Sequence, residues 1–227
     1  MRLCLAFFLL WAPQEAGSVS GRVAAPEGAA QKKLRIKIKY SGPGIANHKD
    51  ADPSPAVVWI EGVEPSKMEP RTVEIRQEGI EFRPRVMALP VGSTVNFPNA
   101  DDVFHNVFSY SKAEKFDLGK YPKGQSKSVE FKNRGLVDVR CEVHDHMRSY
   151  IHIFDHPYYA IVEGDGSYRI PKVPPGKYTL VAWKEFFDPV RQEIEVKADG
   201  ARVDLSLSCL LDRPANAVVG AACCDAR

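Results

Sequence analysis

Apolar and polar residues alternate in short runs along most of the chain. The run K-L-R-I-K-I-K-Y at residues 33–40 alternates strictly between basic and apolar positions. Further runs, such as T-V-E-I-R, I-E-F-R-P-R-V-M and V-G-S-T-V-N-F-P-N, are each closed by Gly, Pro or Asn, which is typical of strands. No stretch of ten or more residues keeps a helical period. The pattern therefore predicts an all-β protein.

These runs divide into groups. Residues 67–157 hold six or seven short strands, which indicates a small sandwich or barrel. A second β series fills residues 158–208, where Asp165-Gly166 predicts a hairpin and V-P-P-G a rigid turn. A proline-containing boundary separates the first group from an N-terminal β segment, residues 19–66, whose run A-V-V-W-I predicts a buried strand.

Residues 1–18 have the pattern of a secretory signal peptide. One arginine precedes an apolar run shorter than the about 20 residues that would span a bilayer, and small residues follow. A buried N-terminal strand or helix is the alternative. We expect an exported protein, periplasmic or secreted, with no membrane span in its mature form. The net charge of +2 gives no reason to expect a nucleic-acid partner.

Export affects how the five cysteines are interpreted. Cys4 would leave with the signal peptide. If Cys141 binds a metal as a thiolate, the cysteines of the tail, residues 209–227, remain for disulfide chemistry, and Cys209 can pair with Cys223 or Cys224. A second copper site in this tail is disfavoured because the tail contains no histidine.

Four residues form a candidate copper site. Cys141, His144 and Met147 lie within the stretch V-R-C-E-V-H-D-H-M, and His105 lies upstream in V-F-H-N-V-F. A copper ion that changes between Cu(I) and Cu(II) is suited by two imidazoles, one thiolate and a weak axial thioether. The sequence therefore predicts one copper ion. His48, His152 and His156 lack such neighbours, and His152, alternating with two isoleucines, is expected to face outward.

Two motifs of this region resemble the plastocyanin-type blue copper proteins, the cupredoxins. They are the run I-E-F-R-P-R-V-M-A-L-P-V-G-S-T-V-N-F with F-H-N-V-F, and the spacing Cys-x-x-His-x-x-Met, which is similar to that of amicyanin in particular. The resemblance covers roughly residues 70–156 and implies a Greek-key sandwich. It implies strong ligands at His105, Cys141 and His144, a weak axial ligand at Met147, and a bracing role for Asn106.

The wider layout, including F-D-L-G-K-Y-P-K-G, also resembles exported bacterial proteins labelled methylamine utilisation proteins. Two residues depart from the cupredoxin pattern: Glu142 follows the cysteine, and His146 lies between the loop ligands. If His146 replaced Met147, the resulting three-nitrogen set would suit Cu(II) storage or zinc.

The second series resembles the carboxypeptidase regulatory-like, transthyretin-related sandwich through I-V-E-G-D-G-S-Y and V-P-P-G-K-Y-T-L. The first strands of such a sandwich are similar to G-R-V at residues 21–23 and to the run at 56–60. We therefore expect the second sandwich to be discontinuous, with the copper domain inserted into it.

The preferred function is that of an exported mononuclear blue copper protein, which carries single electrons between a donor and an acceptor redox protein. Copper binding or delivery without redox turnover is the alternative, and a structural or carbohydrate-associated module is a third possibility. Enzyme activity is not expected, because a copper oxidase or nitrite reductase would need a second cluster of histidines.

Overall fold

The computed structural model of the chain describes residues 16–25 and 54–208, and this part is built of β-strands with no helix. The predicted all-β class is confirmed. Among the described residues no helix is long and apolar enough to cross a membrane. The predicted strand at 33–40, most of the predicted signal peptide and the cysteine tail lie outside the described residues, but Gly17 and Ser18 belong to the first strand, β1.

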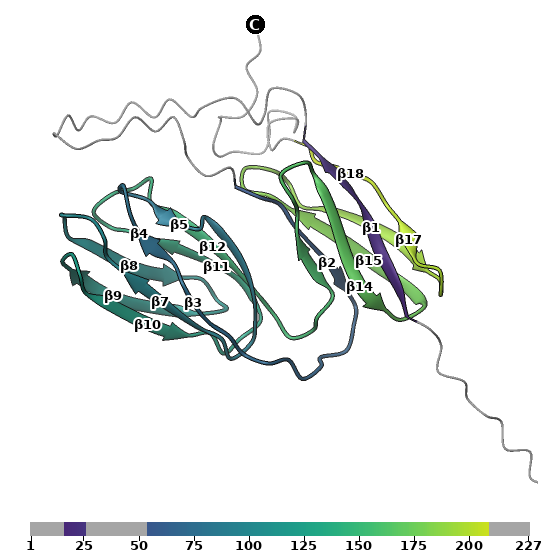
Figure 1. The fold of residues 1–227 in the computed structure, drawn as a ribbon, viewed down its shortest axis with the longest axis horizontal. Helices are drawn as coiled ribbons and strands as arrows, with labels where there is room; N and C mark the ends of the chain where they lie inside the picture. Colours follow the sequence, from purple (N-terminus) through teal and green to yellow (C-terminus); the bar gives the residue numbers. More distant parts are fainter. Residues whose placement is uncertain (1–15, 26–53, 209–227) are drawn as a thin grey trace, which may run out of the picture.

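The first sandwich is formed by the middle of the chain (Figure 1). A three-stranded sheet has the order β10 (Ser126–Glu130), β7 (Thr94–Pro98), β3 (Thr72–Glu74). A five-stranded sheet has the order β6 (Val86–Pro90), β12 (Arg148–Phe154), β11 (Gly135–Arg140), β8 (His105–Tyr110), β9 (Lys115–Tyr121). A short pair, β4 (Arg76–Gln77) and β5 (Phe82–Arg83), completes it. Alternate residues of β7, β11 and β12 fill one buried core.

The second sandwich combines both ends of the described chain. One sheet joins β14 (Ser167–Val173), β1 (Gly17–Ala24) and β17 (Ala201–Arg202), and β18 (Leu205–Ser206) pairs with β1. The other has the order β13 (Tyr159–Ile161), β2 (Val57–Glu61), β15 (Gly176–Trp183), β16 (Val190–Val196). Because β1 and β2 share these sheets and one core with the later strands, the sandwich is discontinuous, as predicted.

Gly21 shows why the G-R-V run suits the position of β1. A Cβ atom at Gly21 would lie 1.8 Å from the carbonyl oxygen of Val203. That distance is far below van der Waals contact, so only glycine lets the two backbones approach so closely. The approach accompanies a hydrogen bond from the Val203 N–H group to the Ser20 carbonyl.

Two strand predictions differ from the structure. The segment K-F-D-L-G-K-Y was not predicted as a strand, yet it forms β9, the edge of the five-stranded sheet, with Phe116 and Leu118 packed against the core. The segment R-V-D-L-S-L alternates as a single strand would, but it forms parts of two short strands, β17 and β18, each pairing in parallel with β1. Both pairings keep the same register along β1, and Val203, Leu205 and Leu207 are buried alternately across the break between the two strands.

Strand β12 is buried on both of its faces. Ile151 and Ile153 belong to the core of the first sandwich, whereas Tyr150 and Phe154 belong to a separate cluster with Val57 of the second sandwich. The second face of β12 therefore forms the interface between the sandwiches.

His152 lies in this interface, and the prediction that it faces outward is wrong. It is only 5% exposed, and its ring centroid lies 4.6 Å from that of Trp183 and 5.6 Å from that of Trp59. Its Nε2 atom has no hydrogen-bond partner. The alternation correctly placed His152 on the face of β12 that points away from the core of the first sandwich, but the second sandwich covers this face.

A largely buried ion pair also joins the sandwiches. Nε and Nη2 of Arg85, just before β6, each lie 2.6 Å from one carboxylate oxygen of Glu185, just after β15. The Glu185 side chain is 3% exposed. Burial alone would lower the pKa of Arg85, but the hydrogen bond and the charge of Glu185 raise it. The guanidinium is therefore the species that compensates the buried carboxylate.

Removing the guanidinium should destabilise the protein strongly. Arg85→Ala leaves Glu185 buried without its counter-charge, which should lower the free energy of unfolding by about 3 kcal/mol. Urea unfolding followed by the fluorescence of Trp59 and Trp183 at the interface would measure this. Arg191→Ala, which breaks the exposed pair with Glu61, is the control and should cost less than about 1 kcal/mol. Equal losses in both variants would contradict the structural role of the Arg85–Glu185 pair.

His152 should make stability depend on pH. Burial lowers its pKa to about 3 in the folded protein, against about 6.5 in an unfolded chain. Between these values the unfolded state binds more protons, so the free energy of unfolding falls as the pH falls, by up to about 1.4 kcal/mol per pH unit. His152→Phe should flatten this dependence when metal-free protein is unfolded in urea between pH 4 and 7. Identical pH profiles in the variant and the wild type would rule out this contribution.

Candidate metal centre

The candidate site lies at one end of the first sandwich, where three adjacent strands of its larger sheet meet. β11 and β12 pair up to Arg140 and Arg148, and the chain between them forms the loop 141–147. The N–H group of Cys141 donates to the carbonyl of Met147, and that of Met147 donates to the carbonyl of His144. These bonds close the loop beside β8, whose first residue is His105.

Three predicted ligands converge in the structure. Nδ1 of His105 lies 3.2 Å from Nδ1 of His144, and each of these nitrogens lies 4.0 Å from Sγ of Cys141. The point equidistant from the three atoms lies about 2.2 Å from each, whereas metal–nitrogen and metal–sulfur bonds are about 2.0–2.3 Å long. The two imidazoles and the thiol are therefore spaced to hold one ion.

The surroundings of Cys141 favour its thiolate. Burial alone would raise the pKa of the thiol, but the interaction with His105 and the backbone N–H groups of Asn106, His144 and Val143 lower it below its ordinary value. A thiolate is the form of cysteine that binds metals. Cys141 is also a free cysteine rather than part of a disulfide.

The two histidines differ in their surroundings. His105 is fully buried, while His144 remains partly exposed to solvent. Burial lowers the pKa of His144, and repulsion from a protonated His105 or His146 would lower it further. The neutral imidazole that results keeps a lone pair for a metal.

Met147, the predicted axial ligand, is fully buried in the same core cluster as Cys141. Its backbone closes the loop, and its side chain lies in the core. A sulfur atom there would be shielded from water. Soft thioether sulfur is a weak ligand that suits copper rather than hard cations.

Asn106 connects the loop to the neighbouring strand β9. Its side-chain oxygen accepts a hydrogen bond of 3.2 Å from the N–H group of Glu142, and its amide nitrogen donates to Oδ1 of Asp117 at 2.8 Å. The residue is buried, so solvent competes little for these bonds. Asn106 thus holds the start of the loop from the segment that supplies His105.

His146 lies outside the cluster formed by the three donor atoms. Its Nε2 lies 3.0 Å from the carbonyl oxygen of Ile80, and because a carbonyl can only accept, Nε2 carries the hydrogen. Its Nδ1 atom keeps a lone pair, but His146 is not among the residues whose donor atoms lie within 4.8 Å of one another, so the three-nitrogen alternative would require its ring to move. Glu142, the other departure from the cupredoxin pattern, is exposed, with a carboxylate oxygen 3.9 Å from Nζ of Lys120.

Sequence reasoning missed Asp101. Oδ2 of Asp101 lies 2.9 Å from Nε2 of His105, on the opposite side of the ring from the donor cluster. Asp101 occurs in the polar run N-A-D-D, which by itself predicts only a loop. Asp101 lies four residues before His105, but that spacing alone is a weak signal. The two side chains meet only because the chain turns between them.

Apolar side chains are exposed beside both ligand-bearing segments. Val103 and Phe104, the latter 58% exposed, directly precede His105, and Val143 directly precedes His144. Exposed apolar side chains that gather in one place often mark an interaction surface.

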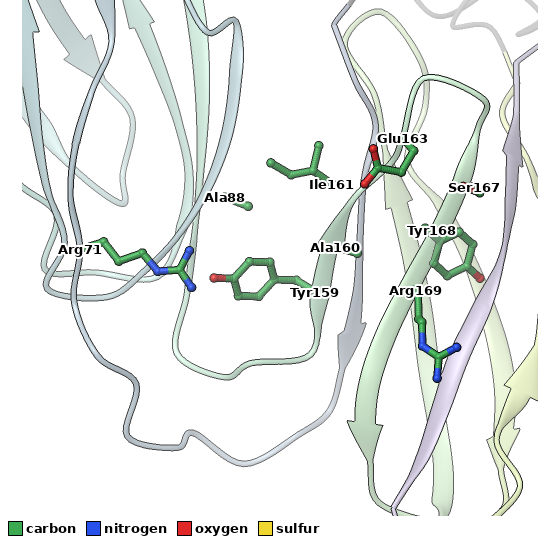
Figure 2. Close-up of a pocket in the computed structure, with 9 residues that line it drawn as sticks. All are labelled: Arg71, Ala88, Tyr159, Ala160, Ile161, Glu163, Ser167, Tyr168 and Arg169. Carbon is green, nitrogen blue, oxygen red and sulfur yellow. The ribbon is translucent and has the colours of Figure 1, made fainter.

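A pocket of about 500 Å³ lies elsewhere, between the two sandwiches. Figure 2 shows Arg71 directed toward the hydroxyl group of Tyr159, with Glu163 and Arg169 further along the lining. None of the candidate ligands lines this pocket. The pocket and the metal centre are thus separate features.

Comparisons with known proteins gave matches to parts of the chain. The family model described as polysaccharide lyase family 4, domain II, matches residues 144–203. No curated protein sequence matches significantly.

Among solved structures, a copper-containing nitrite reductase from Thermus scotoductus SA-01 is similar, with 26% identity, 41% of this chain and 26% of that chain covered, and a TM-score of 0.36. The chain thus spans about a quarter of that reductase. The Cu(I) form of an amicyanin mutant matches with 18% identity, coverages of 43% and 98%, and a TM-score of 0.35. A purple cupredoxin from Nitrosopumilus maritimus matches with 21% identity, coverages of 36% and 99%, and a TM-score of 0.33.

Proposed function

We propose that this chain is an exported protein that binds one copper ion and carries single electrons between a donor and an acceptor redox protein. The convergence of the Cys141 sulfur with the His105 and His144 nitrogens carries this proposal, because one thiolate and two imidazoles suit both oxidation states of copper. Carrying single electrons requires one metal site only, whereas a copper oxidase or nitrite reductase would need a second one. The cupredoxin-like motifs of the sequence support the same function.

The protein's own contribution would be to hold the ligands still. His105, Cys141 and His144 would hold the ion, with Met147 on its buried side. Their donor atoms already lie at suitable distances, and Asn106 fixes the loop from a neighbouring strand. The bound copper would supply the one-electron chemistry. A ligand frame that moves little when the charge of the ion changes favours fast electron transfer.

His144 would be the point of electron entry and exit. It is a proposed ligand with a partly exposed ring, whereas His105 is fully buried. Exposed Phe104 and Val143 beside the ligand-bearing segments offer apolar surface for a partner protein. A partner that docks there would bring its own redox centre close to the ligand.

Copper delivery without redox turnover is the second candidate, and the exposure of His144 is the observation that favours it. A ligand open to solvent can be displaced by a ligand of a partner protein, which would let the ion leave. The two functions share the same ligands, so spectroscopy and electrochemistry distinguish them.

Cu(II) titration of the purified protein should give one equivalent of bound copper and an intense visible band from thiolate-to-copper charge transfer. Reductant should bleach the band and oxidant should restore it. Cys141→Ser should abolish the band while far-UV circular dichroism stays unchanged, because the substitution removes one ligand and little core volume. A colourless Cu(II) complex, or one that cannot be cycled, would contradict electron transfer and favour delivery.

The loop residues His146 and Met147 should respond differently to substitution. His146→Ala should keep the visible band, because its ring lies outside the cluster of donor atoms. Met147→Leu should keep the band but raise the reduction potential, because loss of an axial donor destabilises Cu(II) more than Cu(I). Loss of the band in His146→Ala, together with an unchanged potential in Met147→Leu, would instead identify His146 as the fourth ligand. Visible spectroscopy and cyclic voltammetry on both variants decide between them.

A further inference from the structure

Asp101 is a largely buried acidic residue whose carboxylate makes three directed contacts. Oδ2 lies 2.9 Å from Nε2 of His105 and accepts a 2.9 Å hydrogen bond from the N–H group of Ile80, while Oδ1 accepts a 2.7 Å bond from that of Gly79. Its side chain is only 14% exposed. Both of its oxygens accept hydrogen bonds from backbone N–H groups, which is the contact pattern of an ionised carboxylate, since that form only accepts.

The turn that holds this carboxylate has an unusual backbone. Gly79 and Ile80 both have positive φ angles, 67° and 60°. A β-branched residue with positive φ is strained, and such strain persists only where the surrounding structure enforces it. Here the strained geometry directs two successive N–H groups at one carboxylate, as in other backbone sites that bind anions.

Ile80 connects both histidine-bearing segments of the proposed site. Its N–H group binds Asp101, which contacts His105, and its carbonyl accepts a hydrogen bond from His146 in the ligand loop. A single turn outside the donor cluster is thus bonded to each segment. The backbone strain at Ile80 is offset by its hydrogen bonds to Asp101 and His146, which fix the positions of both segments.

The contact with His105 has a direct electronic consequence. A carboxylate that accepts the Nε2 hydrogen fixes the tautomer, which leaves Nδ1 with its lone pair facing Cys141 and His144. It also makes Nδ1 a stronger donor, and partners of this kind typically contribute 10- to 100-fold to metal affinity. A stronger donor stabilises the more highly charged ion by the larger amount.

We propose that Asp101 is a positioning residue that makes His105 a stronger ligand and lowers the reduction potential of the bound copper. The inference rests on the proposed function, since it concerns the same ion. It goes beyond that function by assigning control of the potential to a carboxylate outside the ligand set. The Gly79–Ile80 turn serves to hold this carboxylate in place.

The test compares Asp101→Asn with Asp102→Asn in the full-length copper-loaded protein. Asn retains the shape of the side chain and an oxygen for His105 but removes the charge. The matched control removes the same charge from the adjacent residue, whose side chain is 88% exposed and pairs with Lys123. Cu(II) and Cu(I) affinities are measured by competition with chelators, and the potential is measured by voltammetry.

Asp101→Asn should weaken Cu(II) binding about tenfold relative to Cu(I) binding, which raises the potential by about 59 mV. Asp102→Asn should leave the ratio of the two affinities unchanged. Equal potentials in the wild type and Asp101→Asn, or equal shifts in both variants, would overturn the inference while the proposed function stands. A wild-type protein without a thiolate–copper band would overturn the proposed function and the inference together.

If Asp101→Asn fails to fold, the wild-type protein still provides a test. In the diamagnetic Cu(I) form, the Nε2 proton of His105 should give a nuclear magnetic resonance signal that is shifted downfield and exchanges slowly with water. A His105 ring proton that exchanges rapidly would show that no carboxylate holds it, and would overturn the inference.

Discussion

The burial of β12 on both faces is the constraint on which the rest of the structure depends. One face completes the core of the first sandwich through Ile151 and Ile153, and the other face, with Tyr150 and Phe154, packs against the second sandwich. Both edges of the strand are also paired, with β11 and β6. The loop 141–147 leads directly into β12. The C-terminal end of the loop is therefore fixed by a strand that cannot shift or rotate without disturbing two cores.

The proposed ligands are held by polar contacts that differ in kind. The Cys141 sulfur is surrounded by backbone N–H groups, which stabilise negative charge without adding a competing ligand. Asn106 ties the loop to the β8 segment, and the Gly79–Ile80 turn is bonded to both histidine-bearing segments. The donor atoms are thus positioned from three directions. Such an arrangement limits the motion of the loop more than its length alone would suggest.

Sequence patterns predicted the features that depend on neighbouring residues in the chain. The spacing of Cys141, His144 and Met147 and the alternation of most strands are local, so they could be recognised. The surroundings of His152 were predicted wrongly because what covers the second face of a strand depends on a distant part of the chain. Asp101 was missed for a similar reason, since its role requires the strained turn at Ile80, which no residue type signals. The discontinuous sandwich was predicted because its separated pieces each kept a recognisable local pattern.

The interrupted order of the second sandwich has a consequence for biosynthesis. β1 and β2 emerge from the ribosome long before β13 to β18, the strands with which they form sheets. Until those strands are made, the nascent chain carries two strands with unpaired edges, of which β2 is strongly apolar. The inserted sandwich can form its sheets from consecutive segments in the meantime. Completion of the outer sandwich therefore comes last, and a chain cut after β12 would lack the strands that cover β1 and β2.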